Sequence, residues 1–171
     1  MKKKFKIRPC VVGLGYVGLP VFQMLSRNFT TCGYDIDKKR IEDLKNRIDK
    51  NLDLSSKDFN LKFNSFFTSE HRKLSEFNFF IVTVPTPIFI NKKPNLNFIR
   101  MSFETISKYI KKKDIIILES TVFPGVTENF CKKILNNNKK KLVADKDFFV
   151  GYSPERVNPG DEKHNLKNIN K

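Results

Sequence analysis

The stretch VVGLGYVGLP, residues 11–20, contains three glycines in the order G-x-G-x-x-G, starting at Gly13. The segment before it, FKIRPCVV (5–12), becomes apolar toward its end and stops at a glycine, which predicts a buried strand. The segment YVGLPVFQMLSR (16–27) repeats apolar residues at helical spacing, and its proline falls in the first turns, where a missing N–H is tolerated. A glycine pattern between a strand and a helix predicts a phosphate-binding turn, whereas the pattern alone would indicate only a chain reversal.

Each glycine of this pattern has its own physical reason. Gly13 permits the tight turn, Gly15 lets the backbone approach a pyrophosphate, and Gly18 lets the helix pack close to the strand. The helix that follows presents free N–H groups and the positive end of its dipole to the phosphates. We therefore expect a dinucleotide to bind over this loop.

An acidic residue follows at the distance that dinucleotide binding requires. TTCGYDID (30–37) reads as a second strand, and Asp35 near its end is placed to accept hydrogen bonds from a ribose diol. A carboxylate there would repel a 2′-phosphate, so we expect NAD rather than NADP. The basic residues 38–40 would favour NADP, but lysines on a helix surface are usually just solvated. The alternative role for Asp35 is to cap the helix expected over residues 38–48.

Strands and helices alternate through the rest of the chain. Ile41, Leu44 and Ile48 fall on one face of the helix expected over residues 38–48. A short helix start is expected near the beginning of segment 53–69. The further elements expected are strands at 63–68, 77–84, 114–120 and 147–153 and helices at 97–111 and 125–135. This alternation predicts a single α/β domain, a Rossmann-type doubly wound parallel sheet of about six strands.

The net charge of +15, from 33 basic and 18 acidic residues, raises the alternative of a nucleic-acid-binding protein. The lysines, however, are spread along the whole chain, and no zinc-finger spacing, basic helix or aromatic-basic motif accompanies them. We therefore expect no specific nucleic-acid partner.

Cysteine usage and hydropathy bear on the cellular compartment. Cys10, Cys32 and Cys131 are odd in number and form no CxxC pair, which argues against a disulfide framework and a zinc site. We expect all three to be small buried hydrophobic residues in a reducing compartment, and we expect no metal site.

The lysines at the start, followed by apolar residues, resemble an export signal, but glycines interrupt the apolar run. No run reaches the ~18 apolar residues of a membrane span, so we expect a cytoplasmic protein without a membrane partner.

Five motifs occur in one order along the chain. They are GLGYVGLP (13–20), GYDIDKKRIEDLK (33–45), VTVPTP (82–87), ESTVFPGVTE (119–128) and YSPERVNPGD (152–161). With these motifs the chain resembles the UDP-glucose/GDP-mannose dehydrogenase family, and within it the branch that oxidises UDP-N-acetyl-hexosamines. The resemblance implies an NAD-dependent oxidoreductase that converts the primary alcohol at C6 of the sugar to a carboxylate, in the synthesis of surface-polysaccharide precursors.

The resemblance also implies roles for individual residues. The cofactor-binding positions it implies are Gly13, Gly15, Tyr16, Val17, Gly18, Asp35, Arg40, Thr86 and Thr121. Thr121 and Glu155 match catalytic positions, and Arg156 and Val157 match positions that touch the nucleotide-sugar. The alternatives are that Thr86 starts a turn between prolines, that Thr121 caps the next helix and that Glu155 forms a surface ion pair. Where many relatives have a glycine this chain has Arg47, which we expect to change only a loop.

The catalytic cysteine of the family lies in a glycine-rich motif beyond the last residue here, as does the second nucleotide-binding domain. None of the three cysteines has glycine-rich surroundings. We therefore expect residues 1–157 to form the NAD-binding domain and 158–171 a truncated polar tail, whether cut by design, frameshift or decay. Such a fragment would be inactive alone and would bind a UDP-sugar weakly or not at all, while the full-length enzyme would be a homodimer. The alternative is a stand-alone NAD-binding module without catalysis.

Overall fold

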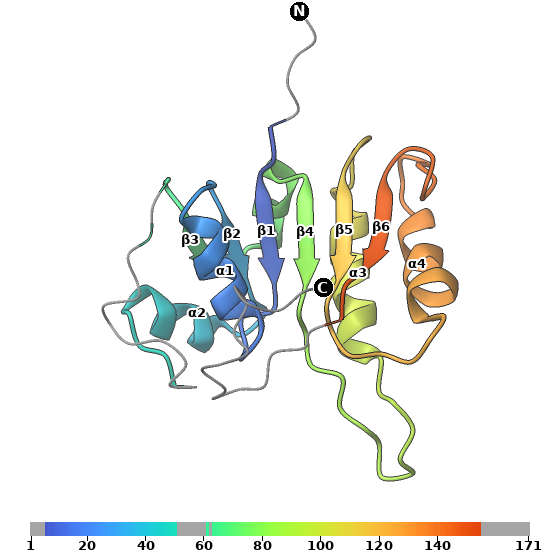
Figure 1. Cartoon of the computed structure of the whole chain (residues 1–171), viewed down its shortest axis with the longest axis horizontal. Helices are drawn as coiled ribbons and strands as arrows, with labels where there is room; N and C mark the ends of the chain where they lie inside the picture. The colour runs from blue at the N-terminus through green and yellow to red at the C-terminus, as the bar shows by residue number, and fades with distance from the viewer. Residues whose placement is uncertain (1–5, 51–60, 62, 155–171) are drawn as a thin grey trace, which may run out of the picture.

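Six short strands form one parallel sheet in the order β3-β2-β1-β4-β5-β6. The structure is a computed structural model that describes residues 6–50, 61 and 63–154. The strands are β1 (Pro9–Val12), β2 (Cys32–Tyr34), β3 (Phe66–Thr68), β4 (Phe79–Val82), β5 (Ile115–Leu118) and β6 (Phe149–Tyr152). All their arrows point the same way, so the carboxyl ends share one edge of the sheet (Figure 1).

Helical segments connect these strands. They are α1 (Gly18–Ser26), α2 (Lys38–Lys45), η2 (His71–Glu76), α3 (Asn97–Ser107), η3 (Val126–Cys131) and α4 (Lys132–Asn136). The expected Rossmann-type fold is confirmed, and every described element except η2 overlaps a predicted range. The helical turn η2 was not predicted. The short helix start expected near residue 53 lies outside the described residues. The strand order reverses between β1 and β4, which is where ligands bind on such sheets, at the carboxyl ends of the strands.

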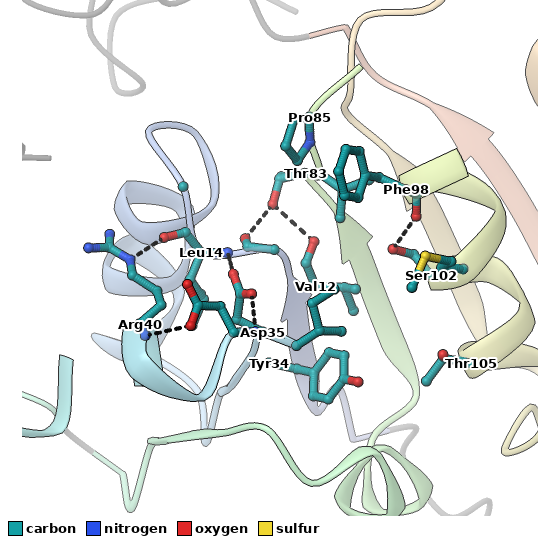
Figure 2. Close-up of a pocket in the computed structure, with 16 residues that line it drawn as sticks. Val12, Leu14, Tyr34, Asp35, Arg40, Thr83, Pro85, Phe98, Ser102 and Thr105 are labelled. Atoms are coloured by element: carbon teal, nitrogen blue, oxygen red, sulfur yellow. Dashed lines mark hydrogen bonds between the residues drawn. The ribbon is translucent and has the colours of Figure 1, made fainter. Parts of the chain in front are cut away.

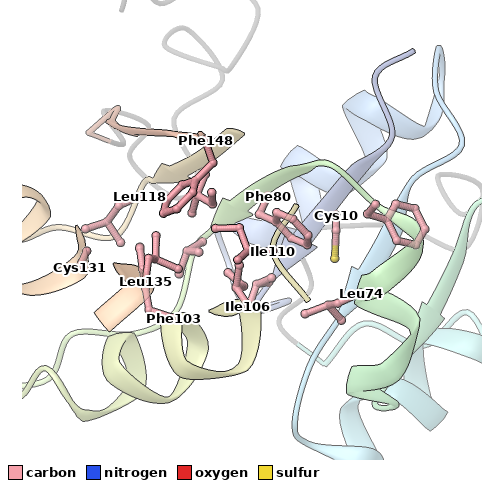
Figure 3. Packing of buried hydrophobic residues seen from close by; sticks show 14 of the residues in the cluster. Cys10, Leu74, Phe80, Phe103, Ile106, Ile110, Leu118, Cys131, Leu135 and Phe148 are labelled. Atoms are coloured by element: carbon pink, nitrogen blue, oxygen red, sulfur yellow. The ribbon is translucent and has the colours of Figure 1, made fainter. Parts of the chain in front are cut away.

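Side chains of β1 alternate between two hydrophobic clusters, one on each face of the sheet. Val11 packs with residues of α1 and α2, including Phe22 and Leu44. Cys10 and Val12 belong to the other cluster, which the sheet forms with η2, α3, η3 and α4 (Figure 3). Because β1 is buried on both faces of the sheet, it contains no polar side chain, as expected for a strand at the centre of a doubly covered sheet.

The cysteines lie inside this core, as expected from the sequence. Cys10 and Cys32 are register partners on β1 and β2, and all three cysteines are buried, free thiols. Burial raises the pKa of the Cys10 thiol, and the neighbouring Cys32 raises it further. Burial likewise raises the pKa of Cys131 to about 12. The thiols of Cys10 and Cys131 are therefore neutral at physiological pH, unlike nucleophilic thiolates.

The end of α2 differs from its prediction. Ile41 and Leu44 are buried, but the expected third member of the face, Ile48, is 50% exposed. The helix ends at Lys45, because Arg47 adopts a left-handed conformation (φ 62°) that turns the chain away. The amide of Ile48 donates to the carbonyl of Asp43 (2.9 Å) and that of Arg47 to Leu44 (3.1 Å). These two bonds form a Schellman motif with Arg47 at the position that glycine usually fills.

Among the described residues, no helix combines the length and the apolar character needed to cross a bilayer. In the same part of the chain, no three His, Cys, Asp or Glu side chains converge as metal ligands would.

Candidate dinucleotide site

A pocket of about 400 Å³ opens at the carboxyl edge of the sheet, where the strand order reverses. One wall comes from the glycine loop after β1 and the end of β2, and the opposite wall from α3 (Figure 2). The lining residues are Val12, Gly13, Leu14, Gly15, Tyr34, Asp35, Ile36, Asp37, Arg40, Thr83, Val84, Pro85, Phe98, Met101, Ser102 and Thr105. The size and the largely apolar lining with a few polar groups suit a small-molecule site.

Two of the three loop glycines are required by the protein itself. Gly13 has φ +95°, and a Cβ there would lie 3.1 Å from the carbonyl oxygen of Thr83. A Cβ on Gly18 would overlap the carbonyl oxygen of Gly13 and lie 2.5 Å from the Thr83 Oγ1. Gly13 therefore makes the turn, and Gly18 allows α1 to approach β1 and β4 closely.

Gly15 is different, because no contact among the described residues requires a glycine there. A Cβ at this position would have no atom within 4 Å, and its φ lies outside the left-handed region. Its amide donates to no acceptor in the part of the chain that the structure describes, and α1 begins without a side-chain cap. A bound group in the space that a Cβ would occupy accounts for the glycine, so the loop fits a pyrophosphate.

Asp35 is held against the loop by two backbone amides. Its Oδ2 accepts from the Leu14 N–H (2.8 Å) and its Oδ1 from the Asp37 N–H (3.0 Å), as Figure 2 shows in part. A carboxylate has about four lone-pair sites, so acceptor capacity remains for ribose hydroxyls. The alternative role as a helix cap is wrong, because Asp37 caps α2 through its Oδ1, which accepts from the amides of Lys39 (2.8 Å) and Arg40 (3.2 Å).

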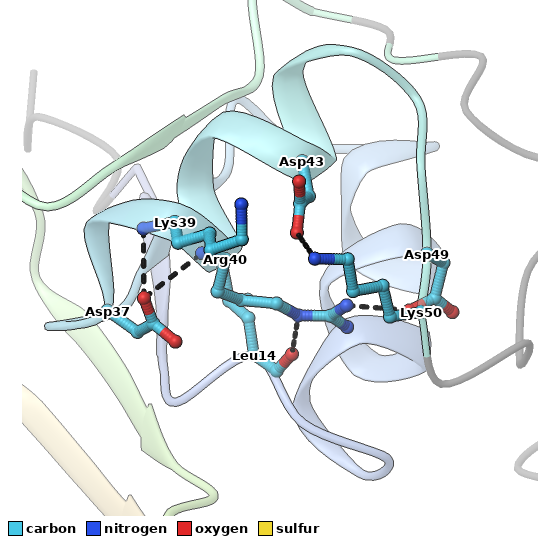
Figure 4. Close-up of polar contacts among 7 residues, drawn as sticks. All are labelled: Leu14, Asp37, Lys39, Arg40, Asp43, Asp49 and Lys50. Carbon is cyan, nitrogen blue, oxygen red and sulfur yellow. Dashed lines mark hydrogen bonds and ion pairs between the residues drawn. The ribbon is translucent and has the colours of Figure 1, made fainter.

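Arg40 lines the pocket, but the described hydrogen bonds of its side chain are made to other protein groups. Its Nε donates to the carbonyl of Leu14 (2.9 Å) and its Nη1 to Asp49 Oδ1 (2.7 Å), as Figure 4 shows. The backbone of Leu14 is thus held at both of its peptide units, by Asp35 at the N–H of the Gly13–Leu14 peptide and by Arg40 at the carbonyl of the Leu14–Gly15 peptide.

One wall of the pocket was not anticipated from the sequence. Phe98, Met101, Ser102 and Thr105 of α3 line it at i, i+3, i+4 and i+7, beside the separate stripe of core residues on the same helix. The sequence does contain a sign of this wall, because Phe98 and Met101 are apolar residues that lie outside the core stripe of the helix. Thr83 was also missed. Its Oγ1 donates to the carbonyl of Gly13 (2.8 Å).

The remaining predicted residues that the structure describes lie outside this lining. Tyr16 is exposed, Val17 is half-buried, and Gly18 is buried under the loop. Thr86 is half-buried and Thr121 is exposed, in the loops after the neighbouring strands β4 and β5. Those two loops are tied together by Ser120 Oγ, which donates to the carbonyl of Val84 (2.7 Å).

The alternative role of Thr121 as a helix cap is wrong. The next helical segment, η3, has Gly125 (φ 88°) at its N-cap and no side-chain capping bond. The other three predicted residues, Glu155, Arg156 and Val157, lie outside the described residues.

A model of the UDP-glucose/GDP-mannose dehydrogenase family, NAD-binding domain, matches residues 7–171. The chain belongs to this family. Over 166 residues it is 43% identical to UDP-N-acetyl-D-glucosamine 6-dehydrogenase from Salmonella typhi, a match that covers 97% of this chain and 39% of the relative. Over 161 residues it is 34% identical to UDP-N-acetyl-D-mannosamine dehydrogenase from Methanocaldococcus jannaschii, a match that covers 90% of this chain and 35% of that relative.

A solved structure agrees with these matches. The UDP-D-ManNAc dehydrogenase from Pyrococcus horikoshii superposes with a TM-score of 0.79 at 31% identity, covering 90% of this chain and 37% of that one. The chain thus corresponds to the NAD-binding part of the family, and NAD is its cofactor. It spans about two fifths of the length of the curated relatives that it matches.

Proposed function

We propose that the chain is the NAD-binding part of a nucleotide-sugar 6-dehydrogenase that acts on a UDP-N-acetyl-hexosamine. The observation that carries the proposal is the open space over Gly15, beside Asp35 and at the reversal of strand order. The similarity to UDP-N-acetyl-D-glucosamine and UDP-N-acetyl-D-mannosamine dehydrogenases supports the substrate class. NAD, when bound, would accept a hydride from the sugar alcohol.

In this proposal each wall of the pocket binds one part of the cofactor. The amide of Gly15 and the start of α1 bind the pyrophosphate. Asp35 accepts hydrogen bonds from the adenosine ribose, and its negative charge disfavours a 2′-phosphate. The apolar side chains of Ile36, Val84 and Phe98 provide a surface for the adenine ring.

The other predicted site residues complete the proposal. Tyr16, Val17 and Gly18 belong to the pyrophosphate loop, and Arg40 supports it. Thr86 and Thr121, on loops tied by the Ser120–Val84 hydrogen bond, would border the nicotinamide half. Glu155 with Thr121 would serve catalysis, and Arg156 and Val157 would touch the nucleotide-sugar. The division into residues 1–157 and 158–171 also stays a proposal.

We propose further that the chain alone does not oxidise a UDP-sugar and binds one weakly. The family's chemistry uses a thiolate, whereas Cys10, Cys32 and Cys131 are buried, and burial raises the pKa of Cys10 and Cys131. The remaining length of the relatives would supply the nucleophile, much of the sugar site and the homodimer contact. A cytoplasmic location, where thiols stay reduced, belongs to the same proposal.

The test is NADH formation at 340 nm with UDP-N-acetylglucosamine and its epimers. We expect no turnover above a heat-inactivated control for the chain alone, and turnover once it is joined to the C-terminal part of a relative. Sustained turnover by the chain alone would contradict the proposal. Absence of turnover in the joined protein, despite NAD binding, would favour a stand-alone NAD-binding module.

A further inference from the structure

A buried ion pair lies behind the glycine loop. Arg40 Nη1 and Asp49 Oδ1 are 2.7 Å apart, and the side chains are 12% and 0% exposed. Asp49 does not line the pocket, and it lies in the turn region that follows α2. A carboxylate so fully buried is costly unless it is paired, so the contact is a firm constraint on Arg40.

The guanidinium group transmits this constraint to the loop. Its donors lie in one plane in a fixed fork, so fixing Nη1 on Asp49 also fixes the direction of Nε. Nε donates to the carbonyl oxygen of Leu14 at 2.9 Å (Figure 4). A lysine at this position could not hold both acceptors in the same geometry.

The orientation of the Leu14 carbonyl decides where the next amide points. In a trans peptide the C=O of Leu14 and the N–H of Gly15 point in opposite directions. Anchoring the carbonyl on Arg40 therefore turns the Gly15 N–H away from α2. Within the described part of the chain, that N–H has no protein acceptor, and no protein atom would lie within 4 Å of a Cβ on Gly15.

We propose that Asp49 is a positioning residue for cofactor binding: it holds Arg40, which sets the Leu14–Gly15 peptide so that the Gly15 amide faces the pyrophosphate. Asp49 itself touches no part of the ligand. The inference rests on the proposed NAD site, and it makes the segment after α2 a determinant of NAD affinity.

The test compares Asp49→Asn, which keeps the size and removes the charge, with Arg40→Lys, which keeps the charge and removes the fork. The matched control is Asp43→Asn, which breaks the Asp43–Lys50 ion pair (2.8 Å) in the same region and leaves the hydrogen bonds of Arg40 to Leu14 and Asp49 in place. Calorimetric titration with NAD should show about tenfold weaker binding for each test variant and unchanged binding for the control. The double variant should bind about as weakly as either single one, because both changes break one chain of contacts.

A second readout needs no cofactor. Hydrogen exchange at the Leu14 amide, which donates to Asp35, should become faster in Asp49→Asn and Arg40→Lys than in the control. Equal NAD affinity in Asp49→Asn and wild type, with a lower Tm alone, would show that Asp49 only stabilises the fold and would overturn the inference. Additive losses in the double variant would overturn it too.

Failure of the proposed function has a different signature, since wild type itself would then not bind NAD. Hydrogen exchange at Leu14 would still report whether Asp49 holds the loop. Should Asp49→Asn not fold, Arg40→Lys carries the same comparison, and unchanged NAD affinity there would contradict the proposal.

Discussion

Thr83 Oγ1 donates a hydrogen bond to the carbonyl oxygen of Gly13 at 2.8 Å, which joins the end of β4 to the loop after β1. Each residue directly follows one of the two strands, β1 and β4, between which the strand order reverses. The hydroxyl also sits against Gly18, where even a Cβ would lie 2.5 Å from it. The buried Thr83 hydroxyl therefore holds the glycine loop against the end of β4.

Replacing Thr83 with Val keeps the shape and removes the donor. We expect the free energy of unfolding to fall by about 1–2 kcal/mol, because a buried carbonyl loses a partner. Urea denaturation followed by circular dichroism measures this, with Thr83→Ser as the control that keeps the hydroxyl. A Val variant as stable as wild type would show that the hydroxyl does not hold the loop.

Gly15→Val should abolish NAD binding while changing the free energy of unfolding by less than about 1 kcal/mol, since the side chain would enter open space. Gly18→Ala is the contrasting variant: its Cβ would overlap the carbonyl of Gly13, so it should unfold the chain or lower its stability by about 3 kcal/mol or more. Calorimetry with NAD and thermal unfolding separate the two effects. Normal NAD binding by Gly15→Val would mean that the loop only turns the chain.

The carboxyl of Asp114 should make stability depend on pH. Burial raises the pKa of Asp114 from 3.8 to about 6, although it accepts a hydrogen bond from the Lys111 amide (2.8 Å). Between these two values the folded chain binds more protons than the unfolded chain, so this group makes stability fall as pH rises from about 4 to about 6. The pKa values of Asp43 and Asp147 are lowered instead, so the stability that these two groups contribute is lost as the pH falls below about 4.

Asp114→Asn should remove that slope and stabilise the chain at pH 7.5 by about 1–2 kcal/mol, because no charge is then buried. Urea unfolding at pH 4.5 and 7.5 checks the expectation, with Asp145→Asn at an exposed position as the control. An unchanged slope in Asp114→Asn would show that another group titrates.

Arg47→Gly should stabilise the chain by about 0.5–1 kcal/mol. The left-handed conformation (φ 62°) costs a residue with a side chain about 1–2 kcal/mol, and the greater freedom of glycine in the unfolded chain offsets part of the gain. Lys45→Gly, at the last residue of α2, should instead destabilise by about 1 kcal/mol. Thermal unfolding of both variants tests the opposite signs, and a destabilised Arg47→Gly would refute this account of the helix end.

The sequence predicts some features of the fold and of the candidate site better than others. The structural roles of Gly13 and Gly18 were predictable, because a turn after β1 and close packing of a helix on that strand each exclude a side chain. The exposure of Ile48 was not, because hydrophobic spacing does not reveal that Arg47 turns left-handed.

Two features of the site escaped prediction for other reasons. The cap of α2 could not be assigned to Asp35 or Asp37 by spacing, since two acids two residues apart compete for one role. The α3 wall was missed because a pocket-lining stripe such as Phe98 and Met101 resembles an ordinary helix surface until the ends of β1 and β4 are placed opposite it.

The central claim is that NAD binds over the glycine loop, with Asp35 selecting against a 2′-phosphate. The most direct measurement is calorimetric titration of the chain with NAD and with NADP, for wild type and for Asp35→Ala. The account predicts that one NAD binds per chain, at least about tenfold more tightly than NADP. That ratio corresponds to a charge-repulsion cost of about 1.4 kcal/mol for the 2′-phosphate, and the ratio of the two affinities should be smaller in Asp35→Ala. Tighter binding of NADP by wild type, or no binding of either nucleotide, would contradict it.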